Sequence, residues 1–457
     1  MPGAGASIPP RVSRVRAFLE SRDMTRDPVA VFAKHSHDLG DTFVYYFGGV
    51  KKTIVTQCPL VLKHVLKDNY KNYHKSDIQV KRMGQFLGPG LLTSHGDYWL
   101  KQRQLIQKGL RRDKLVSLAS TMRDALDDGL ARFDQAVQRG PVDLCEQVRA
   151  LTFRMVTRSL LSTGLKDEEA DLIDRAITAI QDFMVRQIVR PYLAPWFALS
   201  GETRKHDTMR RQGEAILRDH ISRRRRDSNG HDDILQTLLD ARYDDGSVGM
   251  TDEQVLNESM QLLIAAHETS STALSWAIYL LCRHPEHLAR ATAEFETVLG
   301  DAPMTFADVH ALEFNNQVLD EALRLYPPFW MVDRKALTDD RAGDVAIPKG
   351  TTVIAFIFGA HHAPEHWERP SLFDPARFTG ANKDKQPDYT YLPFGAGPRG
   401  CLGGNYAQLQ MLMILSEILR NYQFTLANGS EVATRPRIIL RPQAGIPMTF
   451  RRSKNND

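Results

Sequence analysis

One stretch of this 457-residue chain decides its fold: FGAGPRGCLG, residues 394–403. Its glycines and proline let the backbone turn sharply and approach a flat group closely. A helical pattern begins just after Cys401 and continues to about Leu419, so the cysteine lies where the dipole and free N–H groups of a helix favour a thiolate. Arg399 adds positive charge two residues away. We interpret Cys401 as a metal-ligating thiolate; a buried, inert cysteine in a glycine-rich turn is the alternative.

The composition is that of an ordinary globular protein, 42% hydrophobic and 25% charged. A net charge of +4 is too small for a dedicated nucleic-acid binder, so we expect no nucleic-acid partner. The four cysteines are widely separated, which excludes zinc and iron–sulfur spacings and fits a reducing compartment. No apolar run approaches the roughly 20 residues of a spanning helix, and no signal peptide begins the chain. We therefore expect a cytoplasmic protein without a membrane anchor.

Helical periodicity dominates the chain from Trp99 to Leu325. The longest helix is predicted to begin at Thr251, which forms a capping-box pair with Gln254. Its pattern continues to Leu281, so this helix would be the longest in the chain.

Short strands flank the helical region. Residues 42–47 and 53–55 predict a hairpin, because runs of β-branched and aromatic residues surround Gly48-Gly49. After Pro327-Pro328 ends the preceding helix, strand-like segments such as 352–356 take over.

The domain organisation predicted from these patterns is simple. No repeat and no Gly/Ser linker divides the chain. We expect a mainly α protein with small β-sheets, forming a single domain over residues 1–457. Its helix-rich core would span about 97–326 and its mixed α/β part about 327–457.

A glutamate and two arginines form a second recognisable pattern. Glu321 and Arg324 are spaced i, i+3 and so share one helix face. Another arginine, Arg377, lies in the segment FDPARF, residues 373–378. By itself, the helical pair would be a solvated surface ion pair.

Other arginines are placed to bind carboxylates. Trp99 and Arg103 are one helical turn apart and present an indole N–H and a guanidinium on one face. Arg334 follows the Pro327-Pro328 break. The alternative for each residue alone is a core tryptophan or a surface arginine.

The predicted long helix carries the segment AAHETS, residues 265–270. Its small residues let another group approach the helix closely. Glu268 and Thr269 place a carboxyl beside a hydroxyl, the pair that proton delivery needs. The alternative is a pair of ordinary residues on the polar face of the helix.

In this order and spacing, the segments resemble the cytochrome P-450 family, whose haem-binding loop has the pattern Phe-x-x-Gly-x-Arg-x-Cys-x-Gly. The resemblance implies the P-450 fold, with a long central helix over the haem and the cysteine loop beneath it. Cys401 would be the proximal ligand of the iron of haem b, and its thiolate would favour O–O cleavage. Phe394 and Gly397 would complete the loop, with Phe394 packed against the thiolate.

The same resemblance assigns the remaining motifs. Residues implied to bind the haem propionates are Trp99, Arg103, Arg334 and Arg399. Glu321, Arg324 and Arg377 resemble the structural triad of the family, which holds the cysteine loop rather than performing chemistry.

Residues 265–270 resemble the oxygen-binding signature of the family, with Ala265 beside the haem. The segment departs from the signature at Ala266, where glycine is usual, and the extra methyl narrows the groove. Glu268 and Thr269 would be the catalytic pair that delivers protons to dioxygen.

The activity implied is that of a monooxygenase, which uses dioxygen, two electrons and two protons to oxidise a hydrophobic small molecule. Retention of the acid–threonine pair disfavours the peroxide-driven and isomerase members. An oxidase that couples or desaturates its substrate without oxygen insertion is the main alternative. A non-catalytic haem-thiolate binding protein is a further one.

The sequence has no flavin fingerprint and no cluster of cysteines for an iron–sulfur centre, and we expect no fused reductase. Electrons would come from a ferredoxin or flavodoxin and its reductase, with NAD(P)H acting only through them. We expect a monomer of bacterial origin. The run Arg223–Arg226, followed by aspartates, is predicted to be a solvated loop between helices.

The resemblance places the substrate pocket next to the segment that follows Glu-x-x-Arg. The residues implied to line it are Phe329, Trp330, Met331 and Val332. Residues 79–91 and 183–188 would contribute, with ordinary core packing as the alternative. The apolar lining predicts a hydrophobic or aromatic substrate; fatty acids, terpenoids and aromatic natural products stay open.

Overall fold

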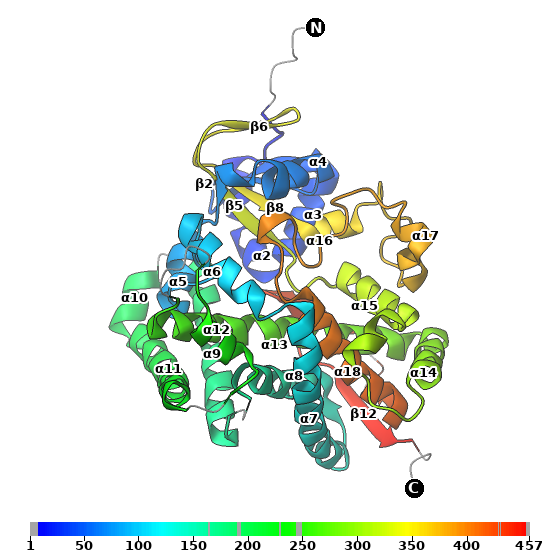
Figure 1. The fold of residues 1–457 in the computed structure, drawn as a ribbon. Helices are drawn as coiled ribbons and strands as arrows, with labels where there is room; N and C mark the ends of the chain where they lie inside the picture. Colours follow the sequence, from blue (N-terminus) through cyan, green and yellow to red (C-terminus); the bar gives the residue numbers. More distant parts are fainter. Residues whose placement is uncertain are drawn as a thin grey trace. The chain divides into compact units, whose positions relative to one another are not determined.

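The computed structural model describes residues 8–162, 165–189, 193–227, 230–243, 249–427, 429 and 431–453 (Figure 1). The chain forms two compact units. The first unit consists of residues 1–76, 317–401 and 433–443, and the second of residues 77–316, 402–432 and 444–457. Each unit is therefore assembled from stretches that are separated in the sequence.

The first unit is built on a five-stranded sheet with the strand order β1-β2-β8-β5-β3. Its strands are β1 (Thr42–Phe47), β2 (Lys51–Thr56), β8 (Thr352–Ala355), β5 (Val332–Ala336) and β3 (Tyr73–His74). The predicted hairpin is confirmed: β1 and β2 pair antiparallel, with Phe43 opposite Val55. Gly48 and Gly49 make its turn with φ of +60° and +76°, values that glycine adopts without a steric penalty.

Short helices surround this sheet. They are α1 (Arg14–Leu19), α2 (Ser21–Arg26), α3 (Pro28–Leu39), α4 (Pro59–Lys63), η1 (His64–Asp68), η2 (Tyr70–Asn72), α16 (Ile357–His362), η6 (Pro375–Phe378), α17 (Gly380–Lys383) and η7 (Gly397–Arg399). Two small two-stranded sheets complete the unit: β6 (Asp340–Ala342) with β7 (Val345–Ile347), and β10 (Thr434–Pro436) with β11 (Leu440–Pro442). Phe32 of α3 lies at the centre of the core, with edge contacts to Phe43, Tyr45 and Phe356.

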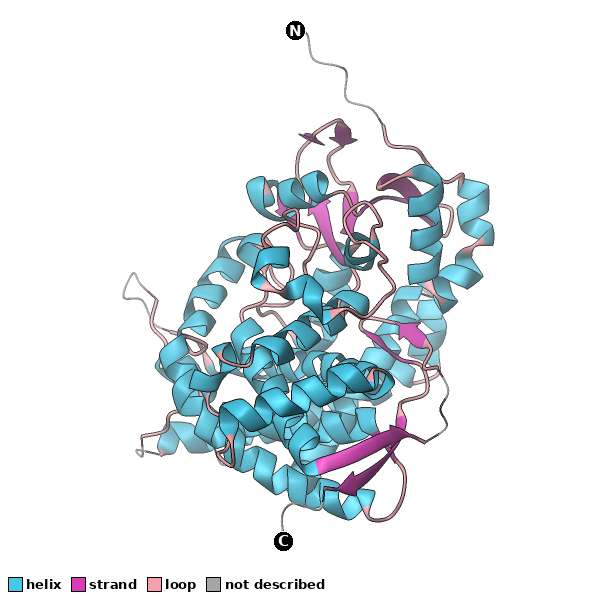
Figure 2. Cartoon of the chain, turned by 90° about the vertical axis from the view of Figure 1, so that its right-hand side faces the viewer, coloured by secondary structure: helices cyan, strands magenta, loops and turns pink. Residues whose placement is uncertain are grey.

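The second unit is mostly helical, as Figure 2 shows for the chain in cyan. Its helices are η3 (Ile78–Met83), α5 (Gly84–Leu87), α6 (Gly96–Lys108), α7 (Arg112–Val137), α8 (Leu144–Leu161), α9 (Asp167–Val189), α10 (Ala194–Leu199), α11 (Glu202–Arg226), α12 (Ile234–Asp240), α13 (Asp252–Arg283), α14 (Pro285–Leu299), η5 (Phe306–His310) and α18 (Gly404–Asn421). The boundary between the units falls within α15 (Glu313–Leu325). One three-stranded sheet, β4-β12-β9, belongs to this unit and comprises Val142–Asp143, Pro447–Arg452 and Tyr422–Leu426.

Helix α13 is the longest helix among the described residues, at 32 residues. The predicted capping box is confirmed, because the Gln254 N–H donates to Thr251 Oγ1 at 3.2 Å and the Thr251 N–H donates to Gln254 Oε1 at 2.9 Å. Most of its side chains are buried, since α8, α11, α12 and α18 pack around it. A helix buried on so many sides is held rigidly, and it can therefore position polar side chains accurately.

No helix within the described ranges combines the length and the hydropathy that crossing a lipid bilayer requires.

Candidate active site

The cysteine loop of the first unit closes on itself through backbone hydrogen bonds. The Gly395 N–H donates to Leu392 O at 3.0 Å, and the Cys401 N–H donates to Phe394 O at 2.8 Å. Gly395 and Gly397 have φ of +69° and +66°, a region that favours glycine. Cys401 is exposed, so the closed loop presents this residue at the surface of the unit.

Gly397 is required by the backbone that lies against it. A Cβ added to this residue would lie 2.0 Å from Leu66 O, in the short helix η1. Only glycine allows this close approach, which places the loop against η1. Gly397 therefore shapes the loop by packing as well as by its dihedral angles.

Arg399 lies in this loop and is partly buried, and the buried Arg334 of the first unit is close enough to act on its charge. Arg334, on β5, is 8% exposed, and its Nη1 donates to Asp333 O at 2.7 Å. Burial lowers the pKa of the Arg334 guanidinium, and burial together with the charge of Arg334 lowers the pKa of Arg399 to about 10. Two cations so close together favour an anionic ligand that carries carboxylates.

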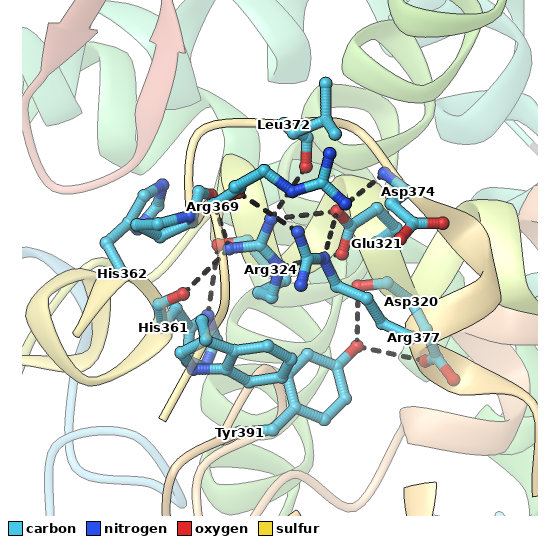
Figure 3. A network of polar contacts seen from close by, with 12 residues as sticks. Asp320, Glu321, Arg324, His361, His362, Arg369, Leu372, Asp374, Arg377 and Tyr391 are labelled. Atoms are coloured by element: carbon cyan, nitrogen blue, oxygen red, sulfur yellow. Dashed lines mark hydrogen bonds and ion pairs between the residues drawn. The ribbon is translucent and has the colours of Figure 1, made fainter. Parts of the chain in front are cut away.

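Glu321, Arg324 and Arg377 are brought together by the structure (Figure 3). The Arg324 guanidinium binds Glu321 through two hydrogen bonds of 2.7 and 2.8 Å. Arg377 Nε lies 3.4 Å from the same carboxylate, and the Asp374 N–H donates to it at 3.0 Å. Glu321 and Arg324 are both 0% exposed, so this is a buried network rather than a surface ion pair.

The remaining hydrogen bonds of Arg324 tie this network to the chain around it. Its two terminal nitrogens donate to the carbonyls of His361, Pro370 and Leu372, at 2.9, 2.8 and 3.2 Å. His361 Nε2 in turn accepts the Leu392 N–H at 2.7 Å. Leu392 lies two residues before the cysteine loop and accepts the Gly395 N–H, so one buried histidine connects the triad to the loop. The sequence pattern does not reveal this role of His361.

The hydroxyl–acid motif lies on α13 in the second unit. Thr269 Oγ1 donates to Ala265 O one turn earlier, at 2.7 Å. Ala265, Ala266 and Thr269 are partly exposed, whereas Glu268 is buried. The partly exposed residues recur at i, i+1 and i+4, and they therefore form one face of the helix.

His267 fixes the opposite side of this motif. Its Nδ1 donates to Leu263 O at 2.8 Å, and its Nε2 lies 3.6 Å from Asp174 Oδ1 on α9. Its ring packs edge-on against Phe153 of α8, with centroids 5.1 Å apart. Contacts with two neighbouring helices therefore set the rotation of α13 at Glu268 and Thr269.

Trp99 and Arg103 share one side of α6, as their spacing predicts. Trp99 is buried, and the Arg103 guanidinium carbon lies 5.7 Å from the centre of the Trp99 ring. A guanidinium over an indole ring is held in place by cation–π attraction.

Trp330 corrects the predicted pocket segment 329–332. It is 3% exposed, its ring packs with those of Phe32 and Phe356, and its Nε1 donates to Arg437 O at 2.8 Å. This side chain therefore belongs to the core of the first unit. Phe329 is 40% exposed, and Met331 and Val332 are partly buried.

In the segment 183–188, Phe183, Met184 and Gln187 are buried, whereas Arg186 is exposed. Phe183 is 0% exposed and stacks on His206 at 4.2 Å. The side chain of Ile188 lies outside the described residues. Residues 79–87 form η3 and the short helix α5, and the loop that follows packs against α13.

The structure corrects the prediction of a loop for the arginine run. Residues 223–226 form the last turn of α11 rather than a loop. Arg224 is buried and binds Asp233 through two hydrogen bonds of 2.8 and 2.7 Å, while Arg225 binds Asp252. The prediction of a loop is wrong because these residues complete α11; Arg223, Arg225 and Arg226 are exposed to solvent as expected, whereas Asp233 neutralises the buried Arg224.

Comparison with known proteins matches the geometry to a family. The cytochrome P-450 family model covers residues 7–450. The chain is 29% identical to cyclooctat-9-en-7-ol 5-monooxygenase of Streptomyces melanosporofaciens, over 76% of this chain and 75% of that protein. It is 28% identical to pentalenene oxygenase of Streptomyces avermitilis, over 82% of each chain. The fold matches the crystal structure of the cytochrome P-450DA haem domain with a TM-score of 0.89, over 99% of each chain at 21% identity. Since the family model spans nearly all of the sequence, this chain belongs to the cytochrome P-450 family.

Proposed function

We propose that this cytochrome P-450 monooxygenase hydroxylates a hydrophobic small molecule and receives its electrons from a separate ferredoxin or flavodoxin. The observation that carries the proposal is the self-closed loop that presents Cys401, with the buried Arg334 and the partly buried Arg399 close together in the same unit. Haem is the prosthetic group that the family implies.

The residues present fit haem. Cys401 offers an exposed thiol for the iron, and a porphyrin with two propionates suits a pair of guanidiniums. Burial already lowers the pKa of Arg334 and Arg399, and an anionic partner would relieve this cost. Bound haem supplies the reductive activation of dioxygen and the transfer of one oxygen atom to substrate.

Cys401 would ligate the iron, with Phe394 beside the thiolate. Arg334 and Arg399 of the first unit would bind the propionates, and the family resemblance gives the same role to Trp99 and Arg103. The Glu321–Arg324–Arg377 network would keep the cysteine loop in the shape that ligation needs, because it is tied to Leu392 through His361.

Thr269 and Glu268 would deliver protons to the reaction site. The Thr269 hydroxyl donates to Ala265 O, so its oxygen remains able to accept a proton or a hydrogen bond. Rotation about χ1 would release Ala265 O and turn the O–H toward a bound molecule. Glu268 is buried beside it and would pass the proton onward, as general acid–base catalysis requires.

The substrate class is supported by two relatives. Their names give cyclooctat-9-en-7-ol and pentalenene as the molecules they oxidise, both of them unsaturated by name. The apolar segment that contains Phe329, Met331 and Val332 fits such a molecule. We therefore propose a largely hydrocarbon substrate with few polar groups.

The first test is the absorption spectrum of the purified protein, reduced and exposed to carbon monoxide. We expect a strongly red-shifted Soret band, which Cys401→Ser should abolish because a serine hydroxyl does not supply a thiolate at neutral pH. Cys282→Ser is the matched control: burial raises the pKa of that thiol, and this variant should keep the band. A band typical of histidine ligation in the native protein would overturn the assignment of Cys401.

The substrate proposal is tested by spin-state shifts with hydrocarbon-like alcohols, fatty acids and phenols. A hydroxylated product that carries one atom from labelled dioxygen is expected with ferredoxin or flavodoxin as electron donor. A coupled or desaturated product without label would instead favour an oxidase.

A further inference from the structure

A buried glutamine of α13, two helical turns before the hydroxyl–acid motif, holds a loop against this helix. Gln261 Oε1 accepts the Leu92 N–H at 2.7 Å. Its Nε2 donates to Leu87 O and Gly88 O, each at 3.1 Å, and lies 3.3 Å from Thr93 Oγ1. Gln261 is 1% exposed, so one amide satisfies several polar groups of residues 87–94 away from water.

Neighbouring residues of α13 reinforce this contact. Glu258 Oε2 accepts the Leu91 N–H at 3.0 Å. A Cβ on Gly88 would lie 2.3 Å from Asn257 Oδ1, and a Cβ on Gly90 would lie 2.5 Å from Gln261 Nε2. The loop therefore approaches α13 so closely that a Cβ at Gly90 would displace the Gln261 amide, while Gly88 also has a φ of +67° that favours glycine.

The loop also braces itself. Thr93 Oγ1 donates to Gly88 O at 2.6 Å and accepts the Gly90 N–H at 3.1 Å. Ser94 Oγ donates to Gly90 O at 2.7 Å. A loop fixed internally in this way moves as one body, so its position depends on the anchor to α13.

The anchor lies on the face of α13 that the motif uses. Gln261, Ala265 and Thr269 follow one another at intervals of four residues, and four-residue neighbours lie on one side of a helix. Leu91 and Leu92, whose N–H groups are bound by this face, have partly exposed side chains. The backbone of Leu91 and Leu92 is therefore held at the start of the row that ends in Thr269.

We propose that Gln261 is a specificity-determining positioning residue: by anchoring residues 87–94 to α13, it sets how much room a substrate has beside Ala265 and Thr269. This inference rests on the proposed function, in which substrate is oxidised next to Thr269. With the anchor in place, compact hydrophobic molecules are favoured; with it removed, the loop moves and bulkier molecules are accepted.

Two variants break the anchor from opposite sides. Gln261→Leu removes the amide. Gly90→Ala keeps the glutamine but adds a Cβ that displaces its Nε2. Gln236→Leu is the matched control, because the side-chain amide of this glutamine of α12 donates to the exposed Asp240 rather than to residues 87–94. All variants are prepared as the haem-loaded full chain, with thermal unfolding measured for each.

Two readouts are used without any substrate turnover. The first is amide hydrogen exchange of residues 87–94, expected to be about tenfold faster or more in both anchor variants and unchanged in the control. The second is the spectral Kd for imidazole and for clotrimazole, a small and a bulky azole. In both anchor variants, the Kd for clotrimazole should fall about tenfold relative to the Kd for imidazole. The variant that combines both substitutions should show little further change beyond either single variant.

The outcomes separate the inference from the function beneath it. Faster exchange with a shifted Kd ratio supports the anchor as a determinant of specificity. Faster exchange with an unchanged ratio would make Gln261 merely structural, and unchanged exchange would show that it does not hold the loop; either result overturns the inference. Loss of the red-shifted carbon monoxide band in the native protein would instead overturn the proposed function.

Discussion

In the first unit, Glu321 and Arg324 form hydrogen bonds with each other and with backbone groups. In the second unit, the Thr269 hydroxyl donates to a single carbonyl of its own helix. The first pair is 0% exposed, and Thr269 with Ala265 is partly exposed. A side chain with every group committed can fix the backbone but cannot take part in a reaction. A hydroxyl with one replaceable bond on a rigid helix can do so.

Electrostatics separates the two regions further. Burial raises the pKa of Glu321 even though Arg324 and Arg377 oppose the rise. The free energy needed to remove two charges from water is nearly as large as the free energy of their attraction. Such a pair therefore contributes little net stability. Removing one partner is costly, however, because the other charge is left buried alone. The network therefore specifies one geometry, and it is sensitive to any single loss.

Arg324→Ala should have the largest effect on folding. It leaves the Glu321 carboxylate buried with fewer partners and leaves three backbone carbonyls without their donor. We expect a loss of about 3–5 kcal/mol in the free energy of unfolding. Chemical denaturation checks the stability, and haem content checks the cysteine loop.

Arg341→Ala is the matched control for this variant, since Arg341 is in the same unit and forms an exposed ion pair with Asp344 at 3.1 Å. Its loss should change the stability by no more than about 1 kcal/mol. If Arg324→Ala were as stable as Arg341→Ala, the network would not be the element that fixes the backbone in this unit.

The sequence predicts the helix around Thr269 well, because residues close together in the sequence determine where this helix begins. A capping box requires only residues three apart, and Thr251 with Gln254 forms it as expected. The spacing of Glu321 and Arg324 likewise places them on one face. That their pair is buried and shares Arg377 depends on a segment more than fifty residues away, which resemblance indicated and periodicity could not.

Other features depend on tertiary packing and left no clear local signal. Trp330 looks like a pocket residue in the sequence, since the pattern does not show that Phe32 and Phe356 enclose it. The charges of residues 223–226 are visible, but their neutralisation by Asp233 and Asp252 is not. Gln261 is one of many polar residues on helices, and only the close approach of Gly88 and Gly90 reveals its role.

Acid should weaken the first unit through two buried histidines, each of which contributes a smaller effect than the loss of Arg324. Burial lowers the pKa of His361 to about 3 and that of His362 to about 4, from the ordinary value of 6.5. Both histidines are therefore neutral in the folded protein at pH values where the unfolded chain binds protons. Their contribution to stability is complete above pH 6.5 and is lost as the pH falls toward 3. At pH 5, the loss is about 2 kcal/mol for each histidine.

Thermal unfolding between pH 7 and 5 measures this dependence. His361→Gln should make it shallower, because a glutamine oxygen still accepts the Leu392 N–H but does not titrate. His37→Gln, at an exposed histidine, is the control and should leave the slope unchanged. An unchanged slope in His361→Gln would show that another group causes the acid sensitivity.

Thr269→Ala should have the smallest effect on folding and so sharpens the comparison most. Alanine has the higher helix propensity, and only one hydrogen bond within the helix is lost, so we expect a stability change within about 0.5 kcal/mol. The carbon monoxide spectrum should also be retained, because the cysteine loop is untouched. Product formed per electron consumed should nevertheless fall by about tenfold or more, with hydrogen peroxide released instead, since proton delivery loses its hydroxyl. Thr269→Ser keeps the hydroxyl and should restore most of the coupling. If Thr269→Ala stayed fully coupled, the Thr269 hydroxyl would serve only as a contact within the helix. The difference between the buried Glu321–Arg324 network and the single hydrogen bond of Thr269 would then have no consequence for function.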